Sequence, residues 1–229
     1  MNIAGFQKLS LIDYPGKVAS VIFTQGCNFR CPYCHNPELI PMKVVDGAPE
    51  KEILAYLEAH RAILEGVCIT GGEPTMQADL PDFMQRIKML GFTVKLDTNG
   101  SNPSMMERII AQRLADYFAM DLKHSWERYA RVAKTNNASA IENCKKTFRL
   151  IQDSGIDHEF RTTVFPQEHT EEDFFDIVGY LREGERYVLQ RISYQKTLNP
   201  KLDGTIEFDV DNIAQKLQET FPRVTIGVR

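Results

Sequence analysis

Hydrophobic positions recur along the chain with two different periods, and segments of one period alternate with segments of the other. Short continuous or alternating apolar runs are typical of β-strands, whereas apolar residues spaced three or four positions apart are typical of α-helices. Seven segments are predicted to be strands: 18–23, 67–70, 92–96, 115–122, 160–165, 187–192 and 224–228. Six stretches between them are predicted to be helices: 49–64, 80–90, 103–110, 141–151, 170–181 and 211–221.

Local signals mark several helix ends. Asn102 followed by Pro103 is a good N-cap and first helical residue. Gly91 is expected to end the second helix. Thr170 with Asp173 resembles a capping box, in which each residue accepts a hydrogen bond at the start of the helix.

The alternation of about six strand–helix units predicts a mostly parallel sheet with right-handed crossovers. Because a closed barrel of this kind has eight units, both a partial barrel and an open doubly wound sheet fit the pattern. In either fold, chemistry is expected in the loops at the carboxyl ends of the strands. Since the sequence contains no linker, repeat or low-complexity tract, we expect one domain over residues 1–229, including a C-terminal part at 195–229.

Composition and charge narrow the class of protein. The chain has 229 residues, of which 43% are apolar and 25% charged, so it can bury a sizeable core. A net charge of −4 with no basic stripe gives no reason to expect nucleic acid. No apolar run approaches the roughly 18 residues of a membrane span, and residues 1–5 lack the layout of a signal peptide. We therefore expect a cytoplasmic protein that binds neither nucleic acid nor a membrane.

Polar motifs lie at the ends of successive predicted strands. They are a cysteine loop after 18–23, then 71–74, 97–100 and 121–123, with 161–163 and 190–191 inside the next two strands. Because parallel strands bring their carboxyl ends to one edge of a sheet, these motifs are expected to converge on one ligand. The convergence is a stronger signal than any of the motifs alone.

The cysteine loop holds three of the five cysteines, Cys27, Cys31 and Cys34, in a C-x3-C-x2-C pattern. Closely spaced thiolates select iron–sulfur clusters, zinc or copper(I). A structural zinc site normally has four protein ligands, so three thiolates favour a cubane cluster with one iron left open. Cys68 and Cys144 lie in apolar patterns and are expected in the core; the alternative for either is a remote fourth ligand.

These motifs resemble those of the radical S-adenosylmethionine (SAM) superfamily, in which an aromatic residue, here Tyr33, precedes the last cysteine. The Gly-Gly-Glu-Pro motif at 71–74 matches as well. Segments 5–17 and 34–39 resemble glycyl-radical-enzyme activating proteins, closest to the anaerobic ribonucleoside-triphosphate reductase activating group, and segment 189–200 fits that group less tightly. The likeness is dense over residues 3–40 and thins after Lys123. It implies a partial (β/α)6 TIM-like barrel with a short N-terminal extension.

The resemblance also implies roles for individual residues. Cys27, Cys31 and Cys34 would bind a [4Fe–4S] cluster whose open iron takes the amino and carboxylate groups of SAM. The residues expected around SAM are Tyr33, Cys34, His35, Gly71, Gly72, Glu73, Asp97, Thr98, Asn99, Asp121, Leu122, Lys123 and Arg161. A monovalent cation is also expected near Asp97 and Asp121.

Several of these residues have plainer alternatives. Tyr33 could serve loop packing alone, and His35 could only cap its loop. Asp97 and Asp121 could be solvated turn residues. Lys123 could meet the ligand carboxylate, neutralise Asp121 or lie on the surface. A buried Arg161 needs an anionic partner, either the ligand or a core aspartate.

The implied reaction is reductive cleavage of SAM, followed by hydrogen abstraction from a glycine of anaerobic ribonucleotide reductase. A flavodoxin or ferredoxin would donate the electron. One alternative substrate is another glycyl radical enzyme such as pyruvate formate-lyase. A small-molecule radical enzyme is disfavoured because the C-terminal region lacks a cysteine group. A different class, a non-catalytic iron–sulfur or zinc protein, stays open.

Overall fold

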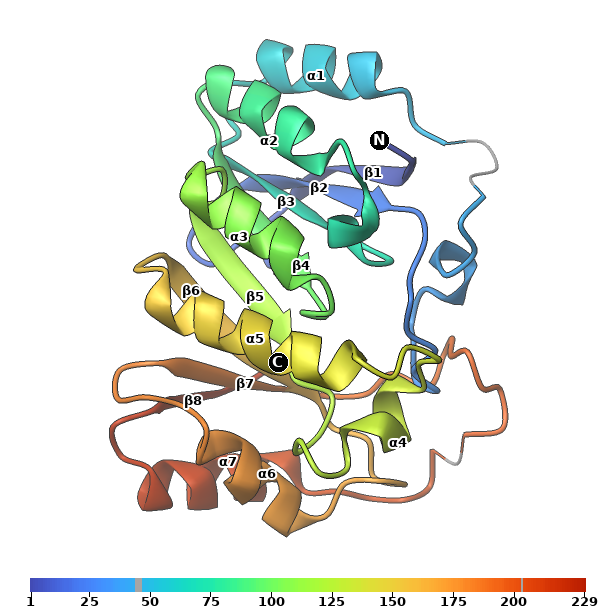
Figure 1. Ribbon diagram of the computed structural model, residues 1–229, viewed down its shortest axis with the longest axis vertical. Helices are drawn as coiled ribbons and strands as arrows, with labels where there is room; N and C mark the ends of the chain where they lie inside the picture. The colour runs from blue at the N-terminus through green and yellow to red at the C-terminus, as the bar shows by residue number, and fades with distance from the viewer. Residues whose placement is uncertain (44–46, 203) are drawn as a thin grey trace.

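The computed structural model of the protein describes residues 1–43, 47–202 and 204–229. Within them, eight strands form one sheet in the order in which they occur in the chain. The strands are β1 (Ile3–Ser10), β2 (Ala19–Thr24), β3 (Gly66–Gly71), β4 (Thr93–Thr98), β5 (Tyr117–Asp121), β6 (Asp157–Thr163), β7 (Arg186–Gln190) and β8 (Thr225–Val228). β1 is antiparallel to β2, and all later neighbours are parallel (Figure 1).

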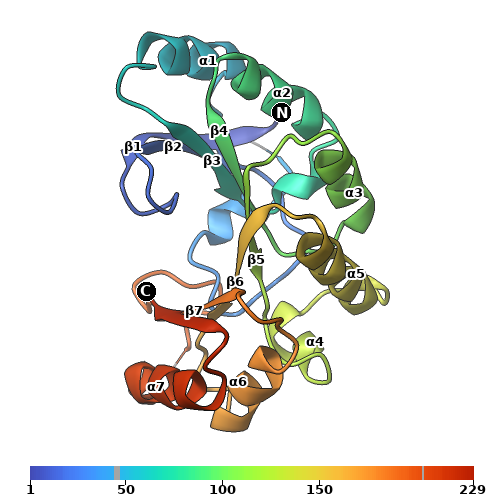
Figure 2. The same cartoon turned by 90° about the vertical axis from the view of Figure 1, so that its left-hand side faces the viewer.

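Helices connect the parallel strands. They are α1 (Glu50–Ala59), α2 (Leu80–Met89), α3 (Pro103–Ala111), α4 (Tyr129–Ala133), α5 (Ala140–Asp153), α6 (Glu171–Val178) and α7 (Val210–Thr220), with short 3-10 turns at Pro37–Leu39 and Pro74–Met76. Figure 2 shows the sheet curling into an open trough, with helices along its outer side. The fold is the partial parallel barrel expected from the sequence. No helix in the described parts of the chain is both long and apolar enough to cross a membrane.

The two faces of the sheet carry different side chains. Successive residues of a strand point to opposite faces. One set, including Val94, Leu96 and Phe118, is fully buried in the hydrophobic core together with helix residues such as Phe83 and Ile109. The alternate set is largely polar and lies on the concave side. Its residues include Lys95, Asp97, Asp121, Glu159 and Arg161.

Most predicted strands and helices are confirmed, and three segments differ. Residues 3–10, expected to be an extension, form the edge strand β1, in which residues 7–9 are exposed and no clear apolar alternation is present. β6 begins at Asp157 rather than residue 160. Its early residue Glu159 is polar because it faces the concave side, where Arg229 binds it at 2.7 and 2.8 Å. The short helix α4 was not expected.

The predicted helix ends are also confirmed. The Asn102 side chain accepts a hydrogen bond from Met105 N at the start of α3. Thr170 and Asp173 form a capping box at the start of α6. Gly91 follows the C-cap of α2 with φ +90°, the left-handed conformation for which glycine is suited.

Candidate active site

A cavity of about 350 Å³ lies at the carboxyl ends of the strands, on the concave side of the sheet. The structure brings together in its lining almost all the residues expected from the sequence. They are Cys27, Cys31, Tyr33, Cys34, His35, Gly71, Gly72, Glu73, Asp97, Thr98, Asn99, Asp121, Lys123 and Arg161. Leu122 is the exception: its side chain is buried in the core, and its backbone N–H donates to Arg161 O at 2.7 Å.

The three loop cysteines are free thiols that face this cavity. The loop follows β2, which ends at Thr24, and is held by hydrogen bonds from Gly26 N to Leu39 O (2.7 Å) and from Cys27 N to Ile40 O (3.1 Å). Burial raises the pKa of Cys27 to about 12 and that of Cys31 to about 11. These thiols therefore keep their protons at neutral pH unless a metal takes the place of the proton.

The donor set fits an iron–sulfur cluster: three soft sulfur atoms from one loop open onto a polar cavity. Among the described residues, no three His, Cys, Asp or Glu side chains are gathered closely enough to hold a single metal ion. A cubane cluster would need a different spacing of its ligands. Each cysteine would bind a different iron, so the three cysteine sulfur atoms would lie farther apart than the ligands of one metal ion.

Gly71 and Gly72 let the end of β3 approach the cysteine loop. A Cβ on Gly72 would lie 2.1 Å from Gly26 O, and one on Gly71 would lie 2.3 Å from Thr24 N. Gly71 also has φ +119°. The close approach allows Glu73 N to donate to Gly26 O at 2.7 Å. Close packing against the cysteine loop is thus a reason for both glycines that adds to the expected approach of a ligand.

Glu73 joins two loops of the site. Its side chain is 1% exposed. One oxygen accepts from Thr75 and from Thr98 Oγ1 (2.8 Å), and the other accepts from Asn99 N (2.6 Å). Burial raises the pKa of Glu73, although these hydrogen bonds oppose the effect. The carboxylate therefore fixes the position of the loop after β4 against the loop after β3.

Asn99 extends that connection to the cysteines. Its Nδ2 donates to Asn28 Oδ1 at 3.0 Å and lies 4.0 Å from Cys27 Sγ, while its backbone carbonyl accepts from Cys144 Sγ at 3.3 Å. Cys144 and Cys68 are fully buried, as expected of core cysteines.

A chain of buried charges crosses the floor of the cavity. Arg161 Nε donates to Asp121 Oδ1 (2.9 Å), and Arg161 Nη1 donates to Asp97 Oδ2 (3.2 Å). Lys123 Nζ donates to Asp121 Oδ2 (3.0 Å), and the Lys95 ammonium pairs with Asp97 Oδ1. Of the alternatives for Arg161 and Lys123, core aspartates are the partners that the structure shows.

The cations determine the charge of both carboxylates. Burial alone would raise the pKa of Asp121, but Arg161 and Lys123 outweigh it and lower the pKa to about 2. The pKa of Asp97 is likewise lowered, because Arg161 and Lys95 outweigh its burial. Asp121 in turn raises the pKa of Lys123 against the effect of burial. Asp97, Asp121 and Lys123 are therefore charged at neutral pH.

Tyr33 and His35 are the residues on either side of Cys34 in the sequence. The Tyr33 ring packs edge-on against Phe165, with ring centroids 5.4 Å apart, and Lys123 Nζ lies 5.9 Å from its centroid. His35 Nε2 accepts from Ser193 N at 3.2 Å. Partial burial lowers the pKa of His35, so its imidazole is neutral and able to accept this bond at neutral pH.

The His35 contact is one of three that join segment 191–202 to the cysteine loop and the turn after it. Asn199 N donates to Pro32 O at 2.9 Å, and Lys196 pairs with Glu38 at 2.7 Å. In Figure 1 this orange segment lies beside the blue cysteine loop.

The cavity also has lining residues that were not among those expected around SAM, including Asp13, Asn36, Thr163 and Gln190. Thr163 and Gln190 belong to the polar motifs 161–163 and 190–191, which were expected to converge on the ligand, and they pair across β6 and β7. Asp13 had no local signal, since it reaches the cavity from the loop after β1.

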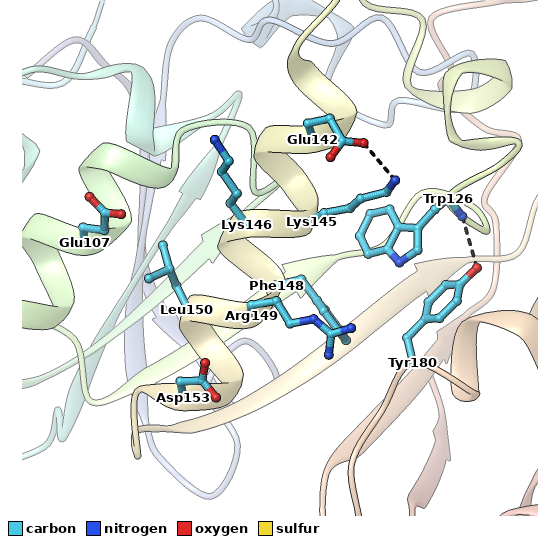
Figure 3. A pocket seen from close by; sticks show the side chains of 10 residues that line it. All are labelled: Glu107, Trp126, Glu142, Lys145, Lys146, Phe148, Arg149, Leu150, Asp153 and Tyr180. Carbon is cyan, nitrogen blue, oxygen red and sulfur yellow. Dashed lines mark hydrogen bonds and ion pairs between the residues drawn. The ribbon is translucent and has the colours of Figure 1, made fainter.

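A second cavity, of about 590 Å³, lies outside the barrel along α5 (Figure 3). Trp126 stacks there between Tyr129 and Tyr180, with centroid distances of 5.2 and 5.6 Å. Its rim carries both cationic and acidic side chains, such as Lys146 and Asp153. None of the cysteines lines it, so the reactive groups belong to the cavity at the strand ends.

A partial parallel barrel whose cavity is lined by three cysteine thiols and by paired charges is typical of one class of proteins, the radical SAM enzymes. The profile of the Radical SAM superfamily matches residues 21–181. The chain therefore belongs to this superfamily, and its relatives place it among the glycyl-radical-enzyme activating enzymes.

One relative is a Methanocaldococcus jannaschii protein described as a glycyl-radical enzyme activating enzyme; it is 35% identical over 82% of this chain and 79% of its own length. Another, the pyruvate formate-lyase-activating enzyme of Clostridium pasteurianum, is 32% identical over 54% of this chain, which spans about half of that enzyme, 52%. Among solved structures, Streptococcus suis SuiB bound to S-adenosylmethionine has a TM-score of 0.72 at 15% identity. The match covers 91% of this chain and 49% of SuiB, a likeness of fold.

Proposed function

We propose that the protein activates anaerobic ribonucleoside-triphosphate reductase by generating a glycyl radical on it. The main observation in support of the proposal is that one cavity is lined both by three cysteine thiols and by the charged side chains of Asp97, Asp121, Lys123 and Arg161. The choice of the reductase rests on the resemblance of segments 5–17 and 34–39 to that activating group. We further propose that residues 1–229 act as a single core domain in a cytoplasmic protein.

In this proposal Cys27, Cys31 and Cys34 hold a [4Fe–4S] cluster, and the polar lining holds SAM. When bound, the reduced cluster supplies one electron to the SAM sulfonium, which yields methionine and a 5′-deoxyadenosyl radical able to take hydrogen from a glycine Cα. The residues of the chain bind and orient SAM. Gly71, Gly72 and Glu73 form one wall, and Asn99 lies against Cys27.

The charge chain on the cavity floor suits the amino-acid end of SAM. Lys95, Lys123 and Arg161 carry three positive charges, whereas Asp97 and Asp121 carry two negative ones. The excess positive charge favours a ligand carboxylate, with Lys123 and Arg161 on the cavity wall. The monovalent cation expected near Asp97 and Asp121 is not needed for this arrangement.

Access to the cavity suits a protein substrate. β1 and β8 are the two ends of the sheet order, so the barrel is open between them in the described residues (Figure 2). We propose that the glycine loop of the partner enters there. The electron is proposed to come from a flavodoxin or ferredoxin.

A second candidate substrate is pyruvate formate-lyase, because several relatives carry that activity in their names. The Clostridium pasteurianum enzyme is one, and the Listeria monocytogenes enzyme, 28% identical over 62% of this chain, is another. The two candidates share the same chemistry and differ only in the partner.

The test is anaerobic reconstitution, followed by mixing with dithionite, SAM and each candidate partner. We expect 5′-deoxyadenosine and, with the reductase, the glycyl radical doublet in electron paramagnetic resonance. Cys31→Ser should abolish both, whereas Cys68→Ala, which removes a buried cysteine outside the loop, should keep both. A doublet with pyruvate formate-lyase alone would select the second candidate, and absence of 5′-deoxyadenosine would refute the enzymatic role.

A further inference from the structure

The Lys95 side chain is a charged group buried beneath the cavity. It is 1% exposed and lies on β4 two residues before Asp97, so both side chains are on the concave face of the sheet. Its ammonium pairs with Asp97 Oδ1 and lies 3.7 Å from Cys68 Sγ. Lys95 is not a lining residue of the cavity, so it acts on the site through Asp97.

The carboxylates of Asp97 and Asp121 are fully paired with side-chain cations. Asp97 receives Lys95 on one oxygen and Arg161 on the other, and Asp121 receives Arg161 and Lys123. A metal cation such as Na⁺ or K⁺ binds through several oxygen ligands, so at this pair it would either lie against the ammonium and guanidinium groups, whose positive charge repels it, or displace one of them. Displacement would leave a buried cation without its partner, which is costly.

We propose that Lys95 is a built-in cation. Its ammonium neutralises Asp97 in the place of a bound monovalent ion, so the site needs neither potassium nor sodium. Lys95 is thus a positioning residue. It keeps Asp97 charged and directed at Arg161, which in turn orients Asp121 and Lys123 at the cavity wall. The consequence for SAM rests on the proposed function, but the pairing itself does not.

The first arm of the test measures thermal unfolding of the full-length, anaerobically purified protein in potassium, sodium or tetramethylammonium chloride at equal ionic strength. The wild-type midpoint should be the same in all three salts. In tetramethylammonium chloride, Lys95→Ala should lower it on the order of 10 °C. Potassium or sodium should recover part of that loss, because the substitution leaves space for a small cation.

Lys95→Met is the matched variant, since it removes the charge but fills the space. It should also lower the midpoint, and no salt should recover it. Cys68→Ala removes the thiol beside Lys95 and keeps the charge of that lysine. The unfolding midpoint of this variant should therefore be the same in all three salts. A wild-type midpoint that rises in potassium or sodium, a Lys95→Met protein as stable as wild type, or a Lys95→Ala loss that no small cation recovers would each overturn the proposal.

The second arm measures SAM binding to the reconstituted protein by calorimetry in the same salts. Wild-type affinity should not depend on the cation, and Lys95→Ala should bind on the order of 10-fold more weakly in tetramethylammonium, as expected for a group behind the contact residues. Wild-type affinity that requires potassium would refute the built-in cation. Absence of any SAM binding would count against the proposed function instead, and the unfolding arm would still decide the role of Lys95.

Discussion

Asp121 is held between two cations, with Arg161 Nε at 2.9 Å and Lys123 Nζ at 3.0 Å from its oxygens. This pairing makes the stability of the protein depend on pH. The pKa of Asp121 is about 2 in the folded protein and about 3.9 in an unfolded chain. The pair therefore contributes its full stabilisation above about pH 4 and loses it as the pH falls toward 2.

Asp121→Asn should lower the free energy of unfolding at pH 7 by on the order of 2 kcal/mol and flatten its fall between about pH 4 and pH 2. Denaturant unfolding at a series of pH values measures both effects. Asp82→Asn is the control, because Asp82 is 74% exposed in its pair with Arg108 and exposed pairs contribute little. If the free energy of unfolding of Asp121→Asn fell between about pH 4 and pH 2 as steeply as that of the wild type, the result would contradict the pairing.

The contacts of some site residues could be predicted from the sequence, and those of others could not. The need of a buried Arg161 for an anion follows from the cost of an unpaired charge, and the structure supplies Asp97 and Asp121. The contacts of Glu73 could not be predicted, because Thr75 lies in the turn after β3 whereas Thr98 and Asn99 lie at the end of β4 and just after it, and only the folded sheet brings these segments together.

Among the elements, the end of β3 lies very close to the backbone that leads into the cysteine loop. Gly72→Ala would place a Cβ 2.1 Å from Gly26 O, so the loop must shift. We expect the variant to bind less iron per chain after reconstitution, measured by iron assay and the visible absorption of the cluster. Gly5→Ala is the control, because its Cβ would meet Phe23 at 3.6 Å, an ordinary contact. Equal iron content in both variants would contradict the argument.

The capping box of α6 gives a second prediction for an element. Thr170→Ala removes the hydroxyl of the box and should cost about 1 kcal/mol, which lowers the midpoint of thermal unfolding by about 2–4 °C. Thr170→Ser keeps the hydroxyl and should restore most of the loss. A Thr170→Ser midpoint as low as that of Thr170→Ala would mean that the hydroxyl does not act as the cap.

The order and type of the elements could be predicted because the strands that pack under helices have continuous apolar faces. The beginning of β6 could not, because Glu159 faces inward to Arg229, which is distant in sequence. The edge strand β1 was missed for a related reason: residues 7–9 of this strand are exposed, so it lacks the apolar alternation that marks the other strands.

Across the whole molecule, segment 191–202 and the cysteine loop make contacts that no local pattern indicates. His35→Ala removes the acceptor of Ser193 N and should increase hydrogen exchange in 191–202, measured by mass spectrometry. Lys196→Ala removes an ion pair of the same segment whose side chains are 58% and 51% exposed, and it should change exchange little. Equal protection in His35→Ala and wild type would exclude this anchoring role.

The contact between Ser193 and His35 joins residues 158 positions apart in the sequence. The cysteine loop leaves the ribosome before its partners in 191–202 have been made. During synthesis the three thiols therefore exist for a time without these contacts. A cluster inserted during synthesis would therefore meet a cysteine loop that segment 191–202 does not yet contact, whereas a cluster inserted later would meet the loop with these contacts in place.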